Sequence, residues 1–97
     1  MSYYGMSRLQ VPQTKAVSGT SATFTNPIGG HVRRFRLWAT VDICFKQGPV
    51  SGLSAATTDH PLGAKQAEYF TCNPGESVAV IAQDGASTGT AYLSEAV

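Results

Sequence analysis

The chain has 97 residues, of which 42% are hydrophobic and only 13% are charged, and its formal net charge is +1. This length allows one domain with a single modest core and excludes a large internal active-site chamber. The low net charge excludes a long-range field that would attract nucleic acid, anionic lipid or an acidic substrate. A surface with so few charges instead favours association with other proteins.

Residues 1–30 are rich in small polar residues and carry only isolated apolar side chains. We therefore expect an extended N-terminal arm with short strands, of which residues 21–25 are the clearest. The two glycines at positions 29–30 mark the end of this arm, and residues 31–97 are expected to form a β-sandwich domain.

Three large apolar side chains, Tyr3, Tyr4 and Met6, lie close together near the start of the arm. Aromatic residues and methionine are enriched in protein interfaces, whereas polar tails rarely contain such a group. We therefore expect the arm to dock on a partner protein through these residues.

Apolar residues occupy every second position between Phe35 and Phe45. This period of two predicts a strand with one face toward the core and one mixed face. Because eleven residues exceed the usual length of a strand, we expect a bend near Thr40 that gives two segments or a strand shared between sheets. Residues 46–49 are expected to end the strand. The core face would carry Phe35, Leu37, Ala39, Val41, Ile43 and Phe45, and the other face Arg34, Arg36, Trp38, Thr40, Asp42 and Cys44.

Residues 49–65 have small side chains and no clear period, which predicts a long surface loop. Residues 67–72 and 77–82 predict an antiparallel hairpin around a turn at 73–76, where proline and glycine favour the required backbone angles. A last strand is expected at 88–95. Together these patterns predict an all-β fold, which is a single small antiparallel β-sandwich or barrel. A jelly-roll-like strand order is one of the arrangements that these patterns allow.

The two cysteines, Cys44 and Cys72, form neither a disulfide scaffold nor a zinc-binding pattern. We favour two reduced, half-buried thiols over a bridge between them, since free cysteine prefers protein interiors. The N-terminal residues lack the pattern of a secretory signal peptide, and the longest apolar run, residues 78–82, is far shorter than the roughly 20 residues of a membrane span. We expect a protein made in a reducing cytoplasm and no contact with a membrane.

The sequence favours no catalytic, cofactor or metal site. His31 and His60 are the two histidines, and neither lies at a metal-ligand spacing from Asp, Glu or Cys. The Asp59-His60 pair is not accompanied by the nucleophile motif of a hydrolase, and no phosphate-binding loop follows the glycines at 29–30. A paired-carboxylate site stays open, although nothing favours it. We therefore expect a protein that is not an enzyme and binds no cofactor.

The basic cluster of the sequence is Arg33, Arg34 and Arg36, and the strand period places Arg34 and Arg36 on the same face as Trp38. Grooves that stack single-stranded nucleic acid usually belong to domains with a marked basic excess, so nucleic acid is disfavoured as a partner. A large aromatic residue on a polar face is either covered by an arm or loop or is an interface anchor. The interface candidates are therefore Tyr3, Tyr4, Met6, Arg34, Arg36 and Trp38.

Three segments carry a resemblance to known proteins. The most specific is E-Y-F followed by P-G-x-x-V-A-V-I at residues 68–81, which residues 36–45 precede and residues 89–95 follow. These segments resemble small β-rich structural proteins that are encoded near the head and tail genes of tailed bacteriophages and prophages. The resemblance covers about the last two-thirds of the chain, and residues 61–64 read Pro-Leu-Gly-Ala where that family has Leu-Pro-Ala-Gly.

The resemblance implies a virion protein without enzymatic activity that is made in the host cytoplasm. It implies a capsid decoration or cement protein, whose partner is the major capsid protein or another virion protein. A homo-oligomer, with a trimer favoured, would match the symmetry of a shell. No functional residue transfers from the family to this chain.

Two other functions stay open at this point. One is a low-copy head–tail connector, tail or fibre-base protein, which is still part of a virion. The other belongs to a different class and is a small carbohydrate-binding module, in which Trp38, Tyr69 and Tyr92 form an exposed stacking platform.

Overall fold

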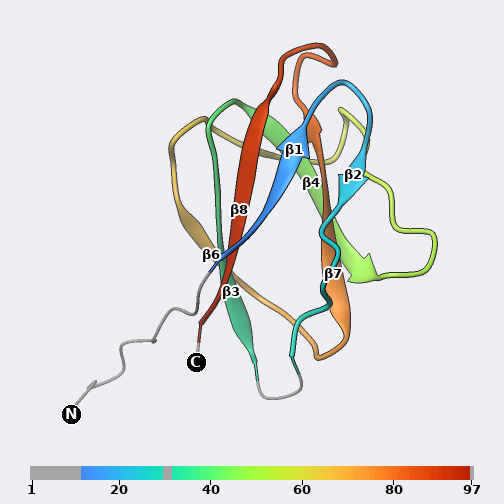
Figure 1. The fold of residues 1–97 in the computed structure, drawn as a ribbon, viewed down its shortest axis with the longest axis vertical. Helices are drawn as coiled ribbons and strands as arrows, with labels where there is room; N and C mark the ends of the chain where they lie inside the picture. The colour runs from blue at the N-terminus through green and yellow to red at the C-terminus, as the bar shows by residue number, and fades with distance from the viewer. Residues whose placement is uncertain (1–11, 30–31, 97) are drawn as a thin grey trace.

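A computed structural model describes residues 12–29 and 32–96 of the chain (Figure 1). In these ranges there is no helix that is long and apolar enough to cross a membrane. The described residues form eight strands, which are β1 (Gln13–Val17), β2 (Ala22–Thr23), β3 (Arg34–Ala39), β4 (Ile43–Pro49), β5 (His60–Leu62), β6 (Glu68–Thr71), β7 (Glu76–Ala82) and β8 (Gly89–Ala96).

The strands form two four-stranded antiparallel sheets that pack face to face. Sheet A has the order β1-β8-β3-β6 and sheet B has the order β2-β7-β4-β5. The described strands therefore form a β-sandwich, as predicted, and not a barrel (Figure 1). The pairing is nested, because β1 pairs with β8, β2 with β7, β3 with β6 and β4 with β5. A long hairpin wound on itself in this way is the jelly-roll arrangement.

The alternating stretch between Phe35 and Phe45 crosses from one sheet to the other. β3 belongs to sheet A and β4 to sheet B, and the bend expected near Thr40 lies between these two strands. The period of two is confirmed, because five odd-numbered residues are buried and half-buried Val41 packs against them. The five are Phe35, Leu37, Ala39, Ile43 and Phe45.

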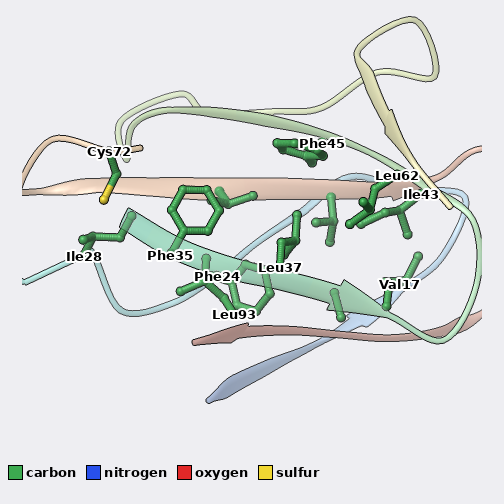
Figure 2. Packing of buried hydrophobic residues seen from close by; sticks show 14 of the residues in the cluster. Val17, Phe24, Ile28, Phe35, Leu37, Ile43, Phe45, Leu62, Cys72 and Leu93 are labelled. Atoms are coloured by element: carbon green, nitrogen blue, oxygen red, sulfur yellow. The ribbon is translucent and has the colours of Figure 1, made fainter. Parts of the chain in front are cut away.

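The core fills the layer between the two sheets (Figure 2). Phe35 of β3 and Phe45 of β4 point into this layer from opposite sheets. Half-buried Phe70 of β6 lies between them, with its ring centroid 5.6 Å from that of Phe35 and 4.8 Å from that of Phe45. Burial of these apolar surfaces is the main favourable term in folding.

Residues 12–29 contribute to both sheets. β1 pairs with β8 in sheet A, and β2 pairs with β7 in sheet B. Beyond β2 the chain stays beside β7, since the N–H of Phe24 donates to the carbonyl of Val78 at 2.9 Å. Val17, Phe24 and Ile28 are buried in the main core. This part of the predicted arm therefore supplies strands and core residues to the sandwich.

The hairpin predicted around residues 73–76 is wrong, because the strands that flank this turn lie in different sheets. β6 pairs with β3 in sheet A, whereas β7 pairs with β2 and β4 in sheet B. The turn itself has the expected chemistry, with Gly75 at a φ of +85° directly after Pro74. Turn residues set the local backbone direction but not the partner strand, so the same turn connects the two sheets.

Two further elements differ from the sequence prediction. β4 continues through Gly48 to Pro49, because it stays paired with β7 up to Glu76. Residues 60–62 form β5 inside the segment predicted as a loop, and this strand is defined by its pairing with β4. A three-residue strand that contains Pro61 has no period that a sequence pattern could show.

The segment between β4 and β5 covers the outer face of sheet B. Its side chains form a second apolar cluster with outward-pointing residues of β4 and β7, so these strands are buried on both faces. The cluster consists of Leu53, Cys44, Ala55, Ala79 and Ile81.

Hydrogen bonds from the N-terminal part of the chain hold this covering segment. The N–H of Ala55 donates to Oγ of Ser21 at 2.8 Å, and Oγ1 of Thr23 donates to the carbonyl of Leu53 at 3.0 Å. The period of two places Cys44 on the mixed face, and Cys44 is buried there because this segment covers it.

We expect Phe35→Ala to lower the free energy of unfolding by about 3–5 kcal/mol, because Phe35 is 0% exposed and its loss leaves a cavity between the sheets. Urea denaturation followed by circular dichroism measures this change. Tyr69→Ala is the control, since Tyr69 is 52% exposed and its loss should cost less than about 1 kcal/mol. Equal losses in the two variants would contradict the central position of Phe35.

Candidate functional site

The side of sheet A that points away from the core is called here the outer A face. It differs from the outer face of sheet B, which carries small apolar residues under a covering segment. The strand register places on this face Thr14, Ala16, Arg34, Arg36, Trp38, Tyr69, Thr71, Tyr92 and Ser94. All of these residues except Ser94 are half-buried or exposed.

An aromatic pair lies on this face. Trp38 of β3 is directly opposite Tyr92 of β8, and their ring centroids are 5.4 Å apart at an interplanar angle of 61°. This edge-on geometry is one of the favoured arrangements of two aromatic rings. Both side chains are half-buried, so part of each stays accessible to a partner.

Arg36 extends the aromatic pair toward β6. It lies two residues before Trp38 on the same face, and in the register it is opposite Ser94 of β8 and Tyr69 of β6. The Arg36 side chain is half-buried, whereas Tyr69 is exposed. The long apolar stem of an arginine covers neighbouring surface while its guanidinium remains available for hydrogen bonds.

Three of the predicted interface candidates are brought together on this face. Arg34, Arg36 and Trp38 all point outward from β3. Tyr69 and Tyr92, which the sequence suggests as part of a stacking platform, share the face with them. The other three candidates, Tyr3, Tyr4 and Met6, lie outside the described residues.

A groove lies where β5 and β6 end the two sheets. Its volume is about 320 Å³, and the rings of Phe45, His60 and Phe70 form its apolar part. The His60 ring lies edge-on to Phe45 at 5.1 Å and to Phe70 at 6.1 Å. Lys46, Gln47 and Asp59 complete the lining. No sequence pattern predicts this groove, because it depends on three strands whose proximity no local pattern encodes.

Gln47 connects the two sheets beside the groove. Its Nε2 donates to the carbonyl of Thr71 in sheet A at 2.7 Å and to Oε1 of Glu76 in sheet B at 3.1 Å. The same Glu76 oxygen accepts the N–H of Asn73 at 2.9 Å. The hydrogen bonds from Asn73 and then from Gln47 lower the pKa of Glu76 below its usual value.

A second hollow, of about 510 Å³, lies just before the start of β4, and its lining includes the acidic side chains of Asp42 and Asp84. Oδ1 of Asp42 accepts a hydrogen bond from the N–H of Ala64 at 2.7 Å. Asp84 accepts the N–H groups of Ala86 and Ser87, each at 2.8 Å, and the hydroxyl of Ser87. These bonds, with the Ser87 hydroxyl as the largest contribution, lower the pKa of Asp84 to about 2. The two carboxylates therefore stabilise turns.

In the described part of the chain, His60 belongs to no cluster of metal-ligating side chains. Across residues 12–29 and 32–96, no group of three or more His, Cys, Asp and Glu side chains could hold a metal ion. His60 packs on aromatic rings, and neighbouring Asp59 accepts the N–H of Ala56 at 2.7 Å. His31 lies outside the described residues.

Cys44 and Cys72 are both free and buried. Cys44 lies on the outer side of sheet B and Cys72 in the main core, so two different apolar layers hold them. Burial raises the pKa of both thiols, and the charges of Asp59 near Cys44 and of Glu76 and Glu95 near Cys72 raise it further. A buried thiol with a raised pKa has little thiolate and is a poor nucleophile.

Comparisons with protein families, with curated proteins and with solved structures find no match to this chain. Among the described surfaces, the outer A face combines an aromatic pair, a half-buried arginine and an exposed tyrosine.

We expect Tyr92→Ala to expose Trp38, because the Tyr92 ring lies directly against it. Trp38 is the single tryptophan of the chain, so its emission should shift to longer wavelength and be quenched more strongly by acrylamide. The loss of an aromatic pair should also cost about 1 kcal/mol of stability. His60→Ala is the control and should leave the emission unchanged, and an unchanged spectrum of Tyr92→Ala would contradict the pairing.

We expect Asp84 to stabilise the protein above its ordinary pKa of 3.8 and to lose this effect as the pH falls toward about 2. The difference in melting temperature between the natural protein and Asp84→Asn should therefore be constant near neutral pH and shrink across this window. Ser87→Ala should raise the pKa of Asp84, because it removes the largest cause of the shift. A difference that does not change with pH would contradict this role of Asp84.

Proposed function

We propose that this protein is a non-enzymatic structural protein of a bacteriophage virion, and that it binds the assembled capsid as a decoration or cement protein. The observation that supports this most directly is the outer A face. Trp, Tyr and Arg are the residues most enriched at the energetic centres of protein interfaces. Here Trp38, Tyr92, Arg36 and Tyr69 gather on one side of one sheet.

The distribution of charge supports a protein partner. The net charge of +1 gives no basic excess that would hold nucleic acid. Interface centres are poor in Lys, Glu and Asp and rich in aromatic residues and Arg, and Trp38 lies on one face with Tyr92 and Arg36. The family resemblance of residues 36–45, 68–81 and 89–95 points to the same class of protein.

In the proposed mechanism, each bound subunit stabilises the shell by mass action. A protein that binds an assembled shell, and does not bind its dissociated subunits, adds its binding free energy to the assembled state at each occupied site. The partner is the major capsid protein, and a trimer placed on a three-fold axis of the shell matches the symmetry of such sites. No catalytic step is required.

Jelly rolls occur both in viral capsid proteins and in lectins, so the fold is compatible with two classes of function and decides neither. The second candidate is a carbohydrate-binding module. The observation that favours it is that the rings of Trp38, Tyr69 and Tyr92 share the outer A face. Titration with soluble glycans would change the emission of Trp38 in this case, and a capsid protein without glycan binding would leave it constant.

The first experiment is the copy number of the protein relative to the major capsid protein, measured by quantitative mass spectrometry in purified particles of the virus that encodes it. A decoration protein occupies repeated positions, so we expect on the order of hundreds of copies per particle. About a dozen copies or fewer would indicate a connector, tail or fibre-base protein instead. Absence from the particles would overturn the proposal.

We expect Trp38→Ala to weaken binding to purified shells by about 30-fold or more, which corresponds to the ~2 kcal/mol of an interface hot spot. Arg36→Ala should also weaken binding. Co-sedimentation of the protein with shells measures the affinity. Val50→Ala is the control and should bind like the natural protein, because Val50 is exposed directly after β4 of sheet B and belongs neither to the outer A face nor to the groove. Unchanged binding by Trp38→Ala would contradict the outer A face as the contact surface.

A further inference from the structure

β6 provides the least protected of the sheet edges in the described structure. Natural proteins protect sheet edges by short strands, by proline and by lysine. β2 has two residues, β5 has three and contains Pro61, and β1 carries Lys15 at its centre. β6 has the sequence Glu-Tyr-Phe-Thr, with neither proline nor lysine, and three of its four residues are exposed.

The backbone of β6 has hydrogen-bonding groups that point away from its partner β3. The N–H of Cys72 donates to the carbonyl of Arg33 at 2.9 Å, so these two residues form a hydrogen-bonded pair. Hydrogen-bonded and non-hydrogen-bonded pairs alternate along antiparallel strands. It follows from the register that the backbone groups of Tyr69 and Thr71 point to the free edge.

One of these outward groups already has a partner. The carbonyl of Thr71 accepts Nε2 of Gln47 at 2.7 Å. Among the described residues, no hydrogen bond reaches the N–H and carbonyl of Tyr69 or the N–H of Thr71. These groups can pair with one additional strand, which is the way in which extended segments add to exposed sheet edges.

The groove lies beside this free edge. Phe70, which precedes Thr71 on β6, points inward and forms one wall, and Phe45 and His60 form the others. A strand added to β6 would place every second side chain above the groove. Its volume of about 320 Å³ and its aromatic lining fit one or two large apolar side chains.

We infer that the free edge of β6 and the adjacent groove bind residues 1–11 of a second copy of this chain. This inference rests on the proposed function and deepens it, since it specifies how decoration subunits associate with one another. The segment contains Tyr3, Tyr4 and Met6, which suit an aromatic groove because methionine and aromatic side chains pack well on rings. Arg8 adds a charge complementary to that of Glu68 on the acceptor strand.

The sheet order favours a neighbouring subunit as the donor. Residues 1–11 precede β1, and β1 and β6 are the two opposite edges of sheet A. The donor and acceptor surfaces therefore lie on different sides of the subunit, which gives a head-to-tail contact that can close into a ring. Eleven extended residues reach about 36 Å, which is enough to extend past the edge of one subunit onto the next.

Binding to the same subunit is the competing arrangement. The segment would then have to cross the sheet, a distance of about 14 Å for three strand spacings. Its path would cover the outer A face, where Trp38 and Tyr92 are still partly accessible. A neighbouring subunit as acceptor leaves that face available for the capsid.

Tyr69→Pro tests the edge in the full-length protein. Proline removes the outward N–H of Tyr69 and blocks an added strand, but it removes no hydrogen bond between β6 and β3. Tyr69→Ala is the matched control, because it removes the same ring and keeps the N–H. By analytical ultracentrifugation we expect the natural protein and Tyr69→Ala to form a closed oligomer and Tyr69→Pro to sediment as a 10.2 kDa monomer.

Two outcomes of this measurement would overturn the inference. One is a natural protein that is monomeric at micromolar concentration, and the other is a Tyr69→Pro variant that is folded and still oligomeric. If Tyr69→Pro does not fold by circular dichroism, the donor side gives the same test. The double variant Tyr4→Ser and Met6→Ser leaves β6 unchanged and should also be monomeric, so an oligomer of the natural size would overturn the inference.

Cross-linking identifies the bound segment and its origin. The natural protein is prepared with ¹⁴N and with ¹⁵N, and the two preparations are mixed in urea, refolded together by dilution and treated with an amine-specific cross-linker. Lys46 lines the groove and Lys65 precedes β6, so we expect links between the N-terminal amine of one isotope and these lysines of the other. Links within one isotope only, or links to Lys15 alone on the opposite edge, would overturn the inference.

Shell binding by the same variants separates this inference from the proposed function. A monomeric natural protein that binds shells would overturn the inference and leave the decoration role intact. An oligomer that is lost in Tyr69→Pro and kept in Tyr69→Ala, but that has no affinity for shells, would leave the inference standing and overturn the decoration role.

Discussion

The crossing from β3 to β4 is the constraint on which the rest of the structure depends. One alternating stretch supplies core-facing residues to both sheets, so the bend at residues 40–42 determines how the two layers face each other. Thr40 makes two hydrogen bonds with Thr90, because its N–H donates to the carbonyl of Thr90 and its Oγ1 accepts the N–H of Thr90, both at 3.0 Å. The carbonyl of Asp42 accepts the N–H of Gln83 at 3.0 Å. These bonds connect the bend to β8 and to the turn after β7.

The two sheets differ in how their outer faces are used, and the cause is the long connection between β4 and β5. This connection adds a second apolar layer to sheet B and is fastened there by Ser21 and Thr23. Sheet A instead presents Trp38, Arg36 and Tyr69 on its outer side. The proposed shell contact and the proposed contact between subunits therefore both belong to sheet A, one through its face and one through the edge of β6.

Much of the fold follows from the sequence because its strongest signals are local. The period of two between Phe35 and Phe45 correctly gives both core strands, and Pro74 and Gly75 correctly give a turn. The partner of each strand could not be predicted, since a turn has the same chemistry within a sheet and between sheets. The same period places the candidates Arg36 and Trp38 on one face, but the groove beside β6 requires the final packing of β4, β5 and β6.

The nested strand order also determines when the chain can fold. The last two strands, β7 and β8, are interior to their sheets, and β1 and β2 have them as their hydrogen-bonded neighbours. During synthesis, neither four-stranded sheet can be completed until residues 76–96 have left the ribosome. Because distant segments must meet before any core is buried, folding of such a topology is slow, on the scale of milliseconds to seconds. A nascent chain interrupted before β8 lacks the strand that pairs with both β1 and β3, so sheet A stays incomplete and its core side chains stay accessible to proteases and chaperones.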